Sequence, residues 1–402
     1  MARIHEQSLI SLDMELAWQS REARHRERYL SRRINLWRDI FPPRMREALL
    51  NRETGGIVRL EYGAGEAVPG YDPKLVHRVP RSQFARQEIR GRVISPLKGR
   101  HYPKGMLGSL PGVFPQNCLP GRIIDLDDAT MTVDLNHPLA RYNLSVQAKI
   151  LDVADKVTET GGRLTCWMEE WADNGPGMQA RHQSQPTQFG IPDGMRRKDE
   201  TDDGRFYREP RMVGHLDSQA SEFLKGLYAD ALPEQAKVLD LMSSMQSHMP
   251  DNPALHVTGL GMNAAEMSAN PRLAEQLVHD LNADPVLPFA DGSFDAVVCS
   301  LSIEYLVRPQ EVLNECARVL RPGGKLLVGF SNRWFPDKAM SMWMDLHEFE
   351  RMGLVLDYFL GTQAFQDLQT VSIRNWWRPE DDPHINTTST SDPVYVVMGT
   401  KS

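Results

Sequence analysis

The pattern of apolar positions divides the chain into three parts. In the first fifty residues, apolar side chains recur at spacings of three and four, as at Leu9, Leu12, Leu16, Leu30 and Ile34. This spacing predicts an N-terminal helical segment over residues 1–53, ended by Pro42 and Pro43. From residue 56, short apolar alternations between Gly/Pro clusters predict strands at 57–60, 122–126, 131–135 and 144–151.

From residue 210 onward, predicted helices alternate with predicted strands. Helices are expected at 218–232, 264–270 and 309–320, and strands at 236–241, 256–260, 294–300 and 325–330. Two further strands, at 370–376 and 393–399, are expected to pair antiparallel. Alternating strands and helices are typical of a parallel sheet covered on both faces, so the predicted fold class is α/β.

Composition narrows the function classes. The 402 residues carry a net charge of -7 and are 41% hydrophobic, which excludes a disordered chain and disfavours general nucleic-acid binding. No apolar run reaches the ~18 residues of a membrane helix, and the first residues lack a secretory signal. The four cysteines show no metal-ligand spacing, so we expect a cytoplasmic protein without a metal site.

Residues 21–46 contain nine arginines against three acidic residues. Such a run is either a basic arm for an acidic partner or a solvated face of the N-terminal segment. The sequence leaves both interpretations open, and it gives no oligomeric state.

Small and polar residues follow three of the predicted strands. Asp240 ends the first of these strands, the second leads into residues 261–263, and Asp280 precedes the segment 287–297. Because ligands bind outside the carboxyl ends of strands in open α/β sheets, we expect one binding site there. Five methionines lie in or near these loops, either as core filler or as a flexible apolar pocket.

Two strings in this part carry a family resemblance. Leu287-Pro-Phe-Ala-Asp-Gly-Ser-Phe-Asp-Ala-Val297 and Ala317-Arg-Val-Leu-Arg-Pro-Gly-Gly324 resemble class I S-adenosylmethionine-dependent methyltransferases of the type 11 group. The resemblance implies a Rossmann-like, seven-stranded methyltransferase domain over residues 211–402, with S-adenosylmethionine as its cofactor. In place of the usual Gly-x-Gly after the first strand, this chain has Met242-Ser243-Ser244-Met245. The cofactor contacts implied are Asp240, Met242, Ser243, Ser244, Gly261, Met262, Asn263, Asp280, Leu281 and Ser300.

The methyl acceptor is harder to identify from the sequence. Polar residues near the predicted strand ends give five candidates for the catalytic side chains, which are His248, Glu304, Tyr305, Asn332 and Arg333. Because no dedicated base stands out, the sequence favours a small-molecule acceptor that needs none, such as a thiol or sulfide. His215, just before the domain, is expected as a contact of a lid.

The front half carries a second resemblance. Tyr71-Asp-Pro-Lys-Leu-Val-His-Arg-Val-Pro-Arg-Ser-Gln-Phe84 and Val133-Asp-Leu-Asn-His-Pro-Leu-Ala140 resemble SlyD-type FKBP prolyl isomerases, which implies a small FKBP-like β domain. Valines stand at 68 and 146, where that family has aromatic pocket residues. The expected domains are therefore 1–53, 56–156, a linker or lid at 157–210, and 211–402. Two alternatives to a methyltransferase remain, an FKBP-type prolyl isomerase or chaperone-like protein, and a non-catalytic S-adenosylmethionine-binding scaffold.

Overall fold

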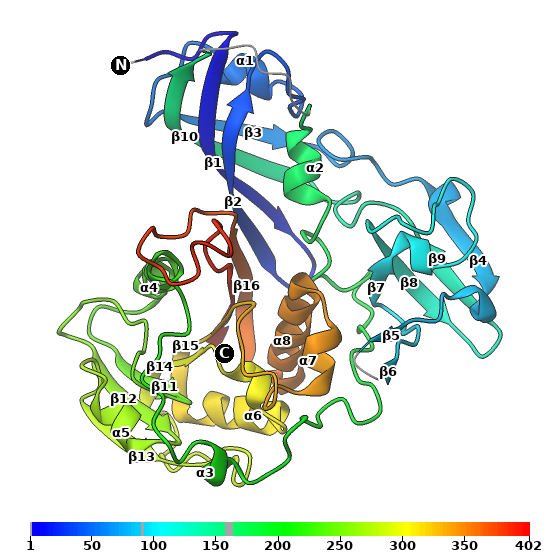
Figure 1. The fold of residues 1–402 in the computed structure, drawn as a ribbon. Coiled ribbons are helices and arrows are strands. Elements are labelled where there is room, and N and C mark those ends of the chain that lie inside the picture. Colours follow the sequence, from blue (N-terminus) through cyan, green and yellow to red (C-terminus); the bar gives the residue numbers. More distant parts are fainter. Residues whose placement is uncertain (1, 90–91, 157–163) are drawn as a thin grey trace. The chain divides into compact units, whose positions relative to one another are not determined.

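The computed structural model describes residues 2–89, 92–156 and 164–402 (Figure 1). The chain forms two compact units. Unit 1 consists of Met1–Phe189 with His347–Gly353, and unit 2 consists of Gly190–Leu346 with Leu354–Ser402. Each unit is described by itself below.

Unit 2 contains seven strands of a mixed sheet in the order β13, β12, β11, β14, β15, β17, β16. Their bounds are β11 Lys237–Leu241, β12 His256–Gly261, β13 Glu275–Val278, β14 Phe294–Ser300, β15 Leu320–Phe330, β16 Phe365–Arg374 and β17 Val394–Lys401. The first five strands in this order pair in parallel, while β17 is antiparallel to both of its neighbours. This arrangement confirms the predicted α/β fold class.

The helices of unit 2 follow the predicted alternation. They are α3 Asp203–Phe206, α4 Ser218–Ala231, α5 Ala264–Ser268, α6 Pro309–Val319, α7 Ser341–Asp345 and the 3₁₀ turn η4 Ile303–Tyr305, with α8 Glu348–Thr362 divided between the units. The side chain of Asp217 caps α4 by accepting a hydrogen bond from the amide of Ala220 at 3.0 Å. Val238 and Val298 on one face of the sheet, and Leu239 and Val297 on the other, are all 0% exposed. Burial on both faces explains why these strands read as continuous apolar runs.

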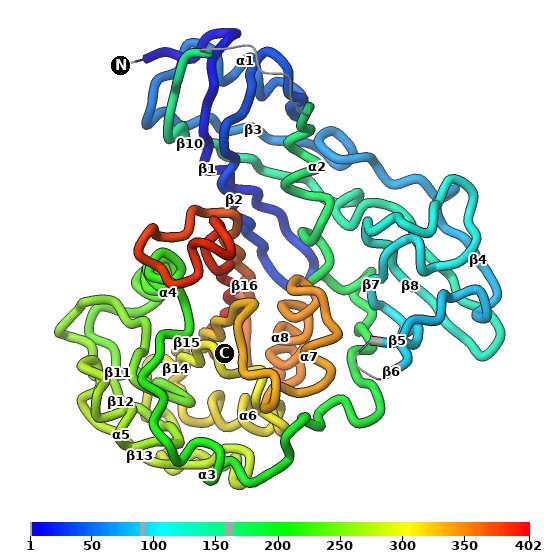
Figure 2. The backbone as a smooth tube through the Cα atoms, in the orientation of Figure 1, coloured from blue at the N-terminus to red at the C-terminus, as the bar shows by residue number. Residues whose placement is uncertain are grey.

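Unit 1 begins with a β-hairpin where the sequence pattern predicted a helix. β1 (Ser8–Gln19) pairs antiparallel with β2 (Arg24–Asn35), and the only helix described within residues 2–53 is α1 (Met45–Leu49) (Figure 2). Leu12, Met14, Leu16 and Trp18 are at most 5% exposed, while the residues between them are more exposed. A spacing of four residues belongs to a helix but is also twice the strand period, so the leucine spacing was misread and the predicted helix is wrong.

The remaining strands of unit 1 form antiparallel sheets. β10 (Leu144–Asp155) lies between β1 and β3 (Ile57–Tyr62). A second sheet has the order β4 (Val76–Pro80), β9 (Thr130–Asp134), β8 (Pro120–Leu126) and β7 (His101–Pro103), and β5 (Glu88–Ile89) pairs with β6 (Arg92–Val93). The strands predicted at 57–60, 122–126, 131–135 and 144–151 are confirmed. Short turns at η1 Pro73–Leu75, η2 Arg81–Gln83 and η3 Lys104–Met106, and helix α2 (Trp167–Ala172), complete the unit.

The residues that the structure describes contain neither a membrane-spanning helix nor a cluster of metal-binding side chains. No helix among them is long and apolar enough to cross a membrane. Within the same residues, no three side chains of His, Cys, Asp or Glu gather closely enough to hold a metal ion.

Candidate functional site

Two small cavities in unit 2 are lined by the loops that follow the strands. The first, here called the Asp280 cavity, has a volume of about 20 Å³ and includes Gly261, Asp280 and Leu281 in its wall. The second, the Glu266 cavity, has a volume of about 80 Å³ and includes Ser243, Ser244, Asn263 and Glu266. Tyr207, Met242, Met262 and Tyr305 line both cavities, so the two adjoin each other.

The loop after β11 is held by hydrogen bonds to a buried carboxylate. Asp240 is 2% exposed, and its Oδ2 accepts hydrogen bonds from the hydroxyls of Ser243 at 2.5 Å and Ser247 at 2.6 Å. Burial raises the pKa of Asp240 to about 6, although the two serine hydroxyls act in the opposite direction. The Ser243 hydroxyl therefore stabilises its own loop, and Asp240 lies beneath the cavity wall.

Gly261, at the end of β12, lies directly under that loop. A Cβ at this position would lie 2.1 Å from the backbone oxygen of Ser243, which is closer than any real contact. The end of β12 therefore requires a glycine, because the loop leaves no room for a side chain. Gly261 contributes only backbone to the Asp280 cavity.

Asn263 and Glu266 bind a segment that precedes the sheet. The Asn263 amide donates to the backbone oxygens of Tyr207 at 2.9 Å and Arg208 at 3.1 Å. Glu266 is 8% exposed, and its carboxylate accepts from the Arg211 amide at 2.7 Å and the Ser244 hydroxyl at 2.6 Å. Residues 207–211 thus use the hydrogen-bonding groups that the Glu266 cavity offers.

A second anchor lies just before residues 207–211, at Asp203. Its carboxylate accepts hydrogen bonds from Arg197 at 2.7 Å and Asn282 at 2.9 Å, and Lys338 lies 3.1 Å away. Burial acts to raise the pKa of Asp203, but these donors hold it below its ordinary value. Residues 197–211, here called the lid segment, are therefore tied to the loop after β13 by a charged and buried anchor.

Asp280 and Leu281 form one wall of the Asp280 cavity, as the resemblance implied. Asp280 accepts hydrogen bonds at Oδ1 from the amides of Asn282 at 2.9 Å and Ala283 at 3.1 Å. Leu281 is 3% exposed. These bonds fix the turn, so one oxygen of the carboxylate holds the backbone while the residue faces the cavity.

Aromatic side chains and a histidine complete the Glu266 cavity. The Tyr305 hydroxyl accepts a hydrogen bond from the Phe335 amide at 2.8 Å, and burial raises its pKa far above the ordinary value. His215 meets the Phe335 ring edge-on, with centroids 5.5 Å apart. Burial lowers the pKa of His215, so its imidazole is neutral at pH 7 and has a nitrogen lone pair.

Six predicted site residues do not line either cavity, and one of them is Asp240, described above. His248 bonds to the Ser221 hydroxyl at 2.8 Å, and its pKa is lowered to about 4, first by burial and then by the charge of His215. Arg333 donates to Asp392 at 3.1 Å, and Ser300 bonds to the hydroxyl of Tyr228 at 2.8 Å. Glu304 is completely buried and Asn332 is exposed. Of the predicted catalytic set, the structure brings only Tyr305 to the cavities.

The sequence interpretation missed Tyr207, Arg211, Glu266 and Phe335. Arg211 lies over the Phe206 ring, with its guanidinium carbon 4.2 Å from the ring centroid. A cluster of aromatic and basic residues at 205–211, just before the predicted domain, was the available signal. The only sequence signal for Glu266 was that it is an acidic residue in the helix predicted after the second strand.

The comparisons with known proteins concern the same region. Residues 242–328 match the model of the methyltransferase domain family. A ubiquinone/menaquinone biosynthesis C-methyltransferase from Roseobacter denitrificans is 41% identical over 122 residues, covering 29% of this chain and 42% of that protein. A ubiquinone biosynthesis O-methyltransferase from Xanthomonas oryzae is 38% identical over 72 residues, covering 18% and 28%. The chain thus spans less than half the length of these curated relatives.

Solved structures of low sequence identity also align. An S-adenosylmethionine-dependent methyltransferase from Thermotoga maritima has a TM-score of 0.32 and 16% identity, covering 46% of this chain and 91% of its own. The [4+2]-cyclase SpnF has a TM-score of 0.34 and 17% identity, covering 49% and 90%. Residues 242–328 are thus similar to the methyltransferase domain family, and the cofactor that such a domain implies is S-adenosylmethionine.

Proposed function

We propose that the protein is an S-adenosylmethionine-dependent methyltransferase that acts on a small-molecule acceptor, with its site in the two cavities of unit 2. One observation carries the proposal. The residues of the matched range that line the cavities lie at or after the carboxyl ends of β11, β12, β13 and β14, which is where an open α/β sheet binds ligands.

The residues present fit the cofactor. Asp280 offers a carboxylate acceptor beside the apolar side chains of Met262 and Leu281, which suits an adenine ring with its exocyclic amine. Glu266 and Asn263 offer acceptors and a donor that suit the ribose and the amino-acid end. When bound, S-adenosylmethionine would supply a methyl group on a sulfonium, so that the acceptor bonds to the methyl carbon in line as the carbon–sulfur bond breaks and S-adenosylhomocysteine leaves.

The lid segment has to move for this binding. The two cavities measure about 20 and 80 Å³, whereas pockets for ligands of this size generally enclose ~300 Å³ or more. Release of Asn263 and Glu266 from the backbone of residues 207–211 would free their polar groups for the ligand. Reclosure of Tyr207 and Arg211 would then exclude water from the reacting atoms.

For the acceptor we propose a planar aromatic compound with an ionisable hydroxyl. Tyr207, Tyr305 and Phe335 form aromatic walls, and the neutral His215 provides a base that can take the hydroxyl proton. A thiol or sulfide was expected because no general base was identified in the sequence. Since His215 is a candidate base, that reason no longer applies. The names of the relatives specify carbon and oxygen methylation in quinone biosynthesis, which agrees with such an acceptor.

Two other functions stay open to test. Prolyl isomerase activity remains an expectation from the resemblance of residues 71–84 and 133–140 to FKBP proteins. A non-catalytic scaffold would bind S-adenosylmethionine and transfer no methyl group. An isomerase assay and an S-adenosylhomocysteine assay on the same preparation distinguish these functions from the methyltransferase.

Calorimetric titration with S-adenosylmethionine tests the cofactor site. We expect Asp280→Asn to weaken binding at least about tenfold, because the amide would place a donor against the amine of adenine. Asp284→Asn is the matched control, since this exposed residue lies in the same loop and lines neither cavity. Absence of binding to the native protein would overturn the proposal.

Turnover tests the acceptor and the base. Small phenols and hydroxyquinones should yield S-adenosylhomocysteine, and thiols or sulfide should yield little. His215→Gln should lower kcat on the best phenol about 100-fold while cofactor affinity is kept, the usual size of a general-base contribution. Thiols as better substrates than phenols, or an unchanged kcat in His215→Gln, would contradict this assignment.

A further inference from the structure

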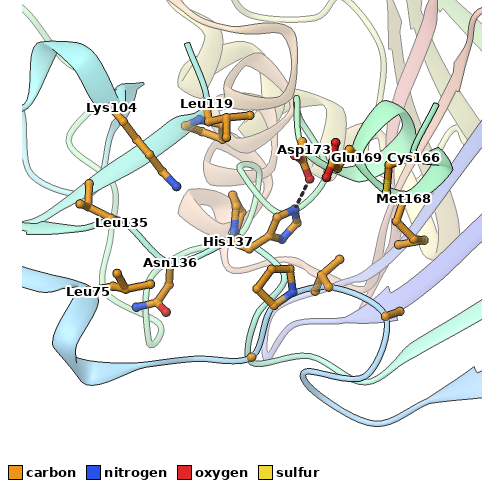
Figure 3. Close-up of a pocket in the computed structure, with 16 residues that line it drawn as sticks. Leu75, Lys104, Leu119, Leu135, Asn136, His137, Cys166, Met168, Glu169 and Asp173 are labelled. Carbon is orange, nitrogen blue, oxygen red and sulfur yellow. Dashed lines mark ion pairs between the residues drawn. The ribbon is translucent and has the colours of Figure 1, made fainter. Parts of the chain in front are cut away.

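Unit 1 contains a cavity that the methyltransferase function does not use. Its volume is about 320 Å³, which is within the size range of small-molecule sites. Apolar side chains form most of its wall, among them Val68, Leu119, Leu135 and Met168 (Figure 3). None of the described residues that line it is aromatic, so the wall suits an aliphatic ligand rather than a flat ring.

His137 is built into this cavity in one tautomer. The neighbouring Asn136 is locked by hydrogen bonds to the backbone of Asp72 and to the Asp134 carboxylate at 2.7 Å. The Nδ1 atom of His137 accepts from the Leu139 amide at 3.0 Å, so the proton of a neutral ring lies on Nε2. The His137 side chain is 9% exposed, and its Nε2 is buried without a hydrogen-bond partner.

Lys104 provides a positive charge on the same cavity. Figure 3 shows its side chain extending from η3 into the space opposite His137. Burial lowers the pKa of Lys104, while the charges of Asp173 and Asp134 act in the opposite direction. No residue that the structure describes forms an ion pair or hydrogen bond with its ammonium group, so only the more distant charges of Asp173 and Asp134 offset the cost of its partial burial.

Two carboxylates face the cavity from α2 and the residue after it. The Asp173 carboxylate lies 3.5 Å from Nε2 of His137, beyond good hydrogen-bond distance. Glu169 lies at the exposed rim, and its carboxylate accepts no hydrogen bond from the residues that the structure describes. The cavity therefore presents one ammonium and two carboxylates with bonding capacity left, while the Nε2 atom of His137 is buried and faces Asp173.

We propose that this cavity binds a small aliphatic zwitterion, namely an amino acid with a branched apolar side chain or a dipeptide of such residues. The ligand carboxylate would pair with Lys104, and its ammonium would pair with Asp173 and Glu169. A ligand with only an anionic group would face two carboxylates. A ligand with only a cationic group would leave Lys104 uncompensated.

Ligand-observed NMR and calorimetry on the full chain test this proposal with four probes. These are L-leucine, leucyl-leucine, 4-methylpentanoate, which lacks the amine, and 3-methylbutylamine, which lacks the carboxylate. At least one zwitterion should bind at least tenfold more tightly than either singly charged analogue, and the two zwitterions distinguish a free amino acid from a peptide. Failure of both zwitterions to bind, or equal affinity for a singly charged analogue, would overturn the proposal.

Variants locate the binding. Lys104→Met should weaken zwitterion binding at least tenfold, and Asp173→Asn should do the same through the ammonium end. Lys149→Met is the matched control because this exposed lysine lies on β10 and does not line the cavity. Thermal unfolding of each variant separates lost binding from lost fold. Native affinity in a folded Lys104→Met protein would contradict the assigned site.

Discussion

The two units differ in how the polar groups around their cavities are satisfied. In unit 2, Asn263 and Glu266 are bound to the protein's own residues 207–211, and the cavities are about 20 and 80 Å³. In unit 1, Lys104 and Glu169 have no such partners among the described residues, and the cavity is about 320 Å³. In the proposed functions, the site of unit 2 is closed in this structure and opens by exchanging hydrogen bonds, whereas the proposed site of unit 1 is open already.

Buried titratable groups show a second difference. His25 of unit 1 stacks on Trp18 at 3.8 Å between ring centroids, and burial lowers its pKa to about 3. Asp240 of unit 2 is also buried, but because it is an acid its pKa is raised to about 6. Burial favours the neutral form of both side chains. Lowering the pH should therefore decrease the stability of the region around His25 and increase the stability of the region around Asp240.

The largest expected effect is that of His25. Because its folded pKa is depressed from 6.5 to about 3, the unfolded chain binds more protons in this range, and stability falls as pH drops through it. In His25→Phe, which keeps an aromatic ring against Trp18, the loss between pH 7 and pH 3 should be smaller by about 5 kcal/mol. Urea unfolding over this pH range measures the difference. Parallel profiles for the two proteins would contradict the buried, neutral histidine.

The next effect has the opposite sign. Because the folded pKa of Asp240 is raised, its contribution is fully present below the unfolded value of 3.8 and is lost as pH rises through about 6. Relative to the native protein, Asp240→Asn should therefore gain about 3 kcal/mol of stability between pH 4 and pH 7. The same unfolding series provides the test. A relative loss over that interval would show that the carboxylate is charged and stabilising.

A pair of glycine substitutions tests the closed site of unit 2. Gly261→Ala should cost about 3 kcal/mol, because the new Cβ meets the Ser243 oxygen at 2.1 Å. Gly226→Ala, on the exposed side of α4 with nothing within 4 Å of its Cβ, should stabilise by about 0.5–1 kcal/mol. Thermal unfolding compares the two. A tolerated Gly261→Ala would mean that the Ser243 loop does not lie over β12 as described.

The smallest effect concerns the hairpin of unit 1. Arg28 on β2 makes a two-point contact with Asp13 on β1, at 3.0 and 2.7 Å, although the residues are fifteen positions apart. A double-mutant cycle with Asp13→Asn and Arg28→Met should give a coupling of about 0.5–1 kcal/mol. A single helix would hold these side chains too far apart to interact, so zero coupling would favour the helical interpretation.

The secondary structure of unit 2 could be predicted from the sequence better than that of unit 1, for a physical reason. Strands buried on both faces, such as β11 and β14, are short continuous apolar runs, and their order along the chain was readable. In β1 the leucines at 12 and 16 satisfy both the helical and the strand period, so spacing alone could not decide. The alternation of Met14 and Trp18 with polar neighbours was the better evidence.

The candidate site was predictable where it depends on local sequence. Met242, Met262, Asp280 and Leu281 follow strands directly, and all four line the cavities. Tyr207, Arg211 and His215 reach the site through bonds to residues more than fifty positions away, as between Arg211 and Glu266. Such contacts leave no spacing pattern. For the same reason the sequence could not show that His248 bonds to Ser221 on α4.

Hydrogen–deuterium exchange of the full chain, with and without S-adenosylmethionine, tests the central claim most directly. We predict slower exchange in unit 2 alone, in the loops at 240–245, 261–266 and 279–282, with a change in residues 207–211 as the lid segment exchanges its partners. Unchanged exchange throughout, or protection confined to unit 1, would contradict the account.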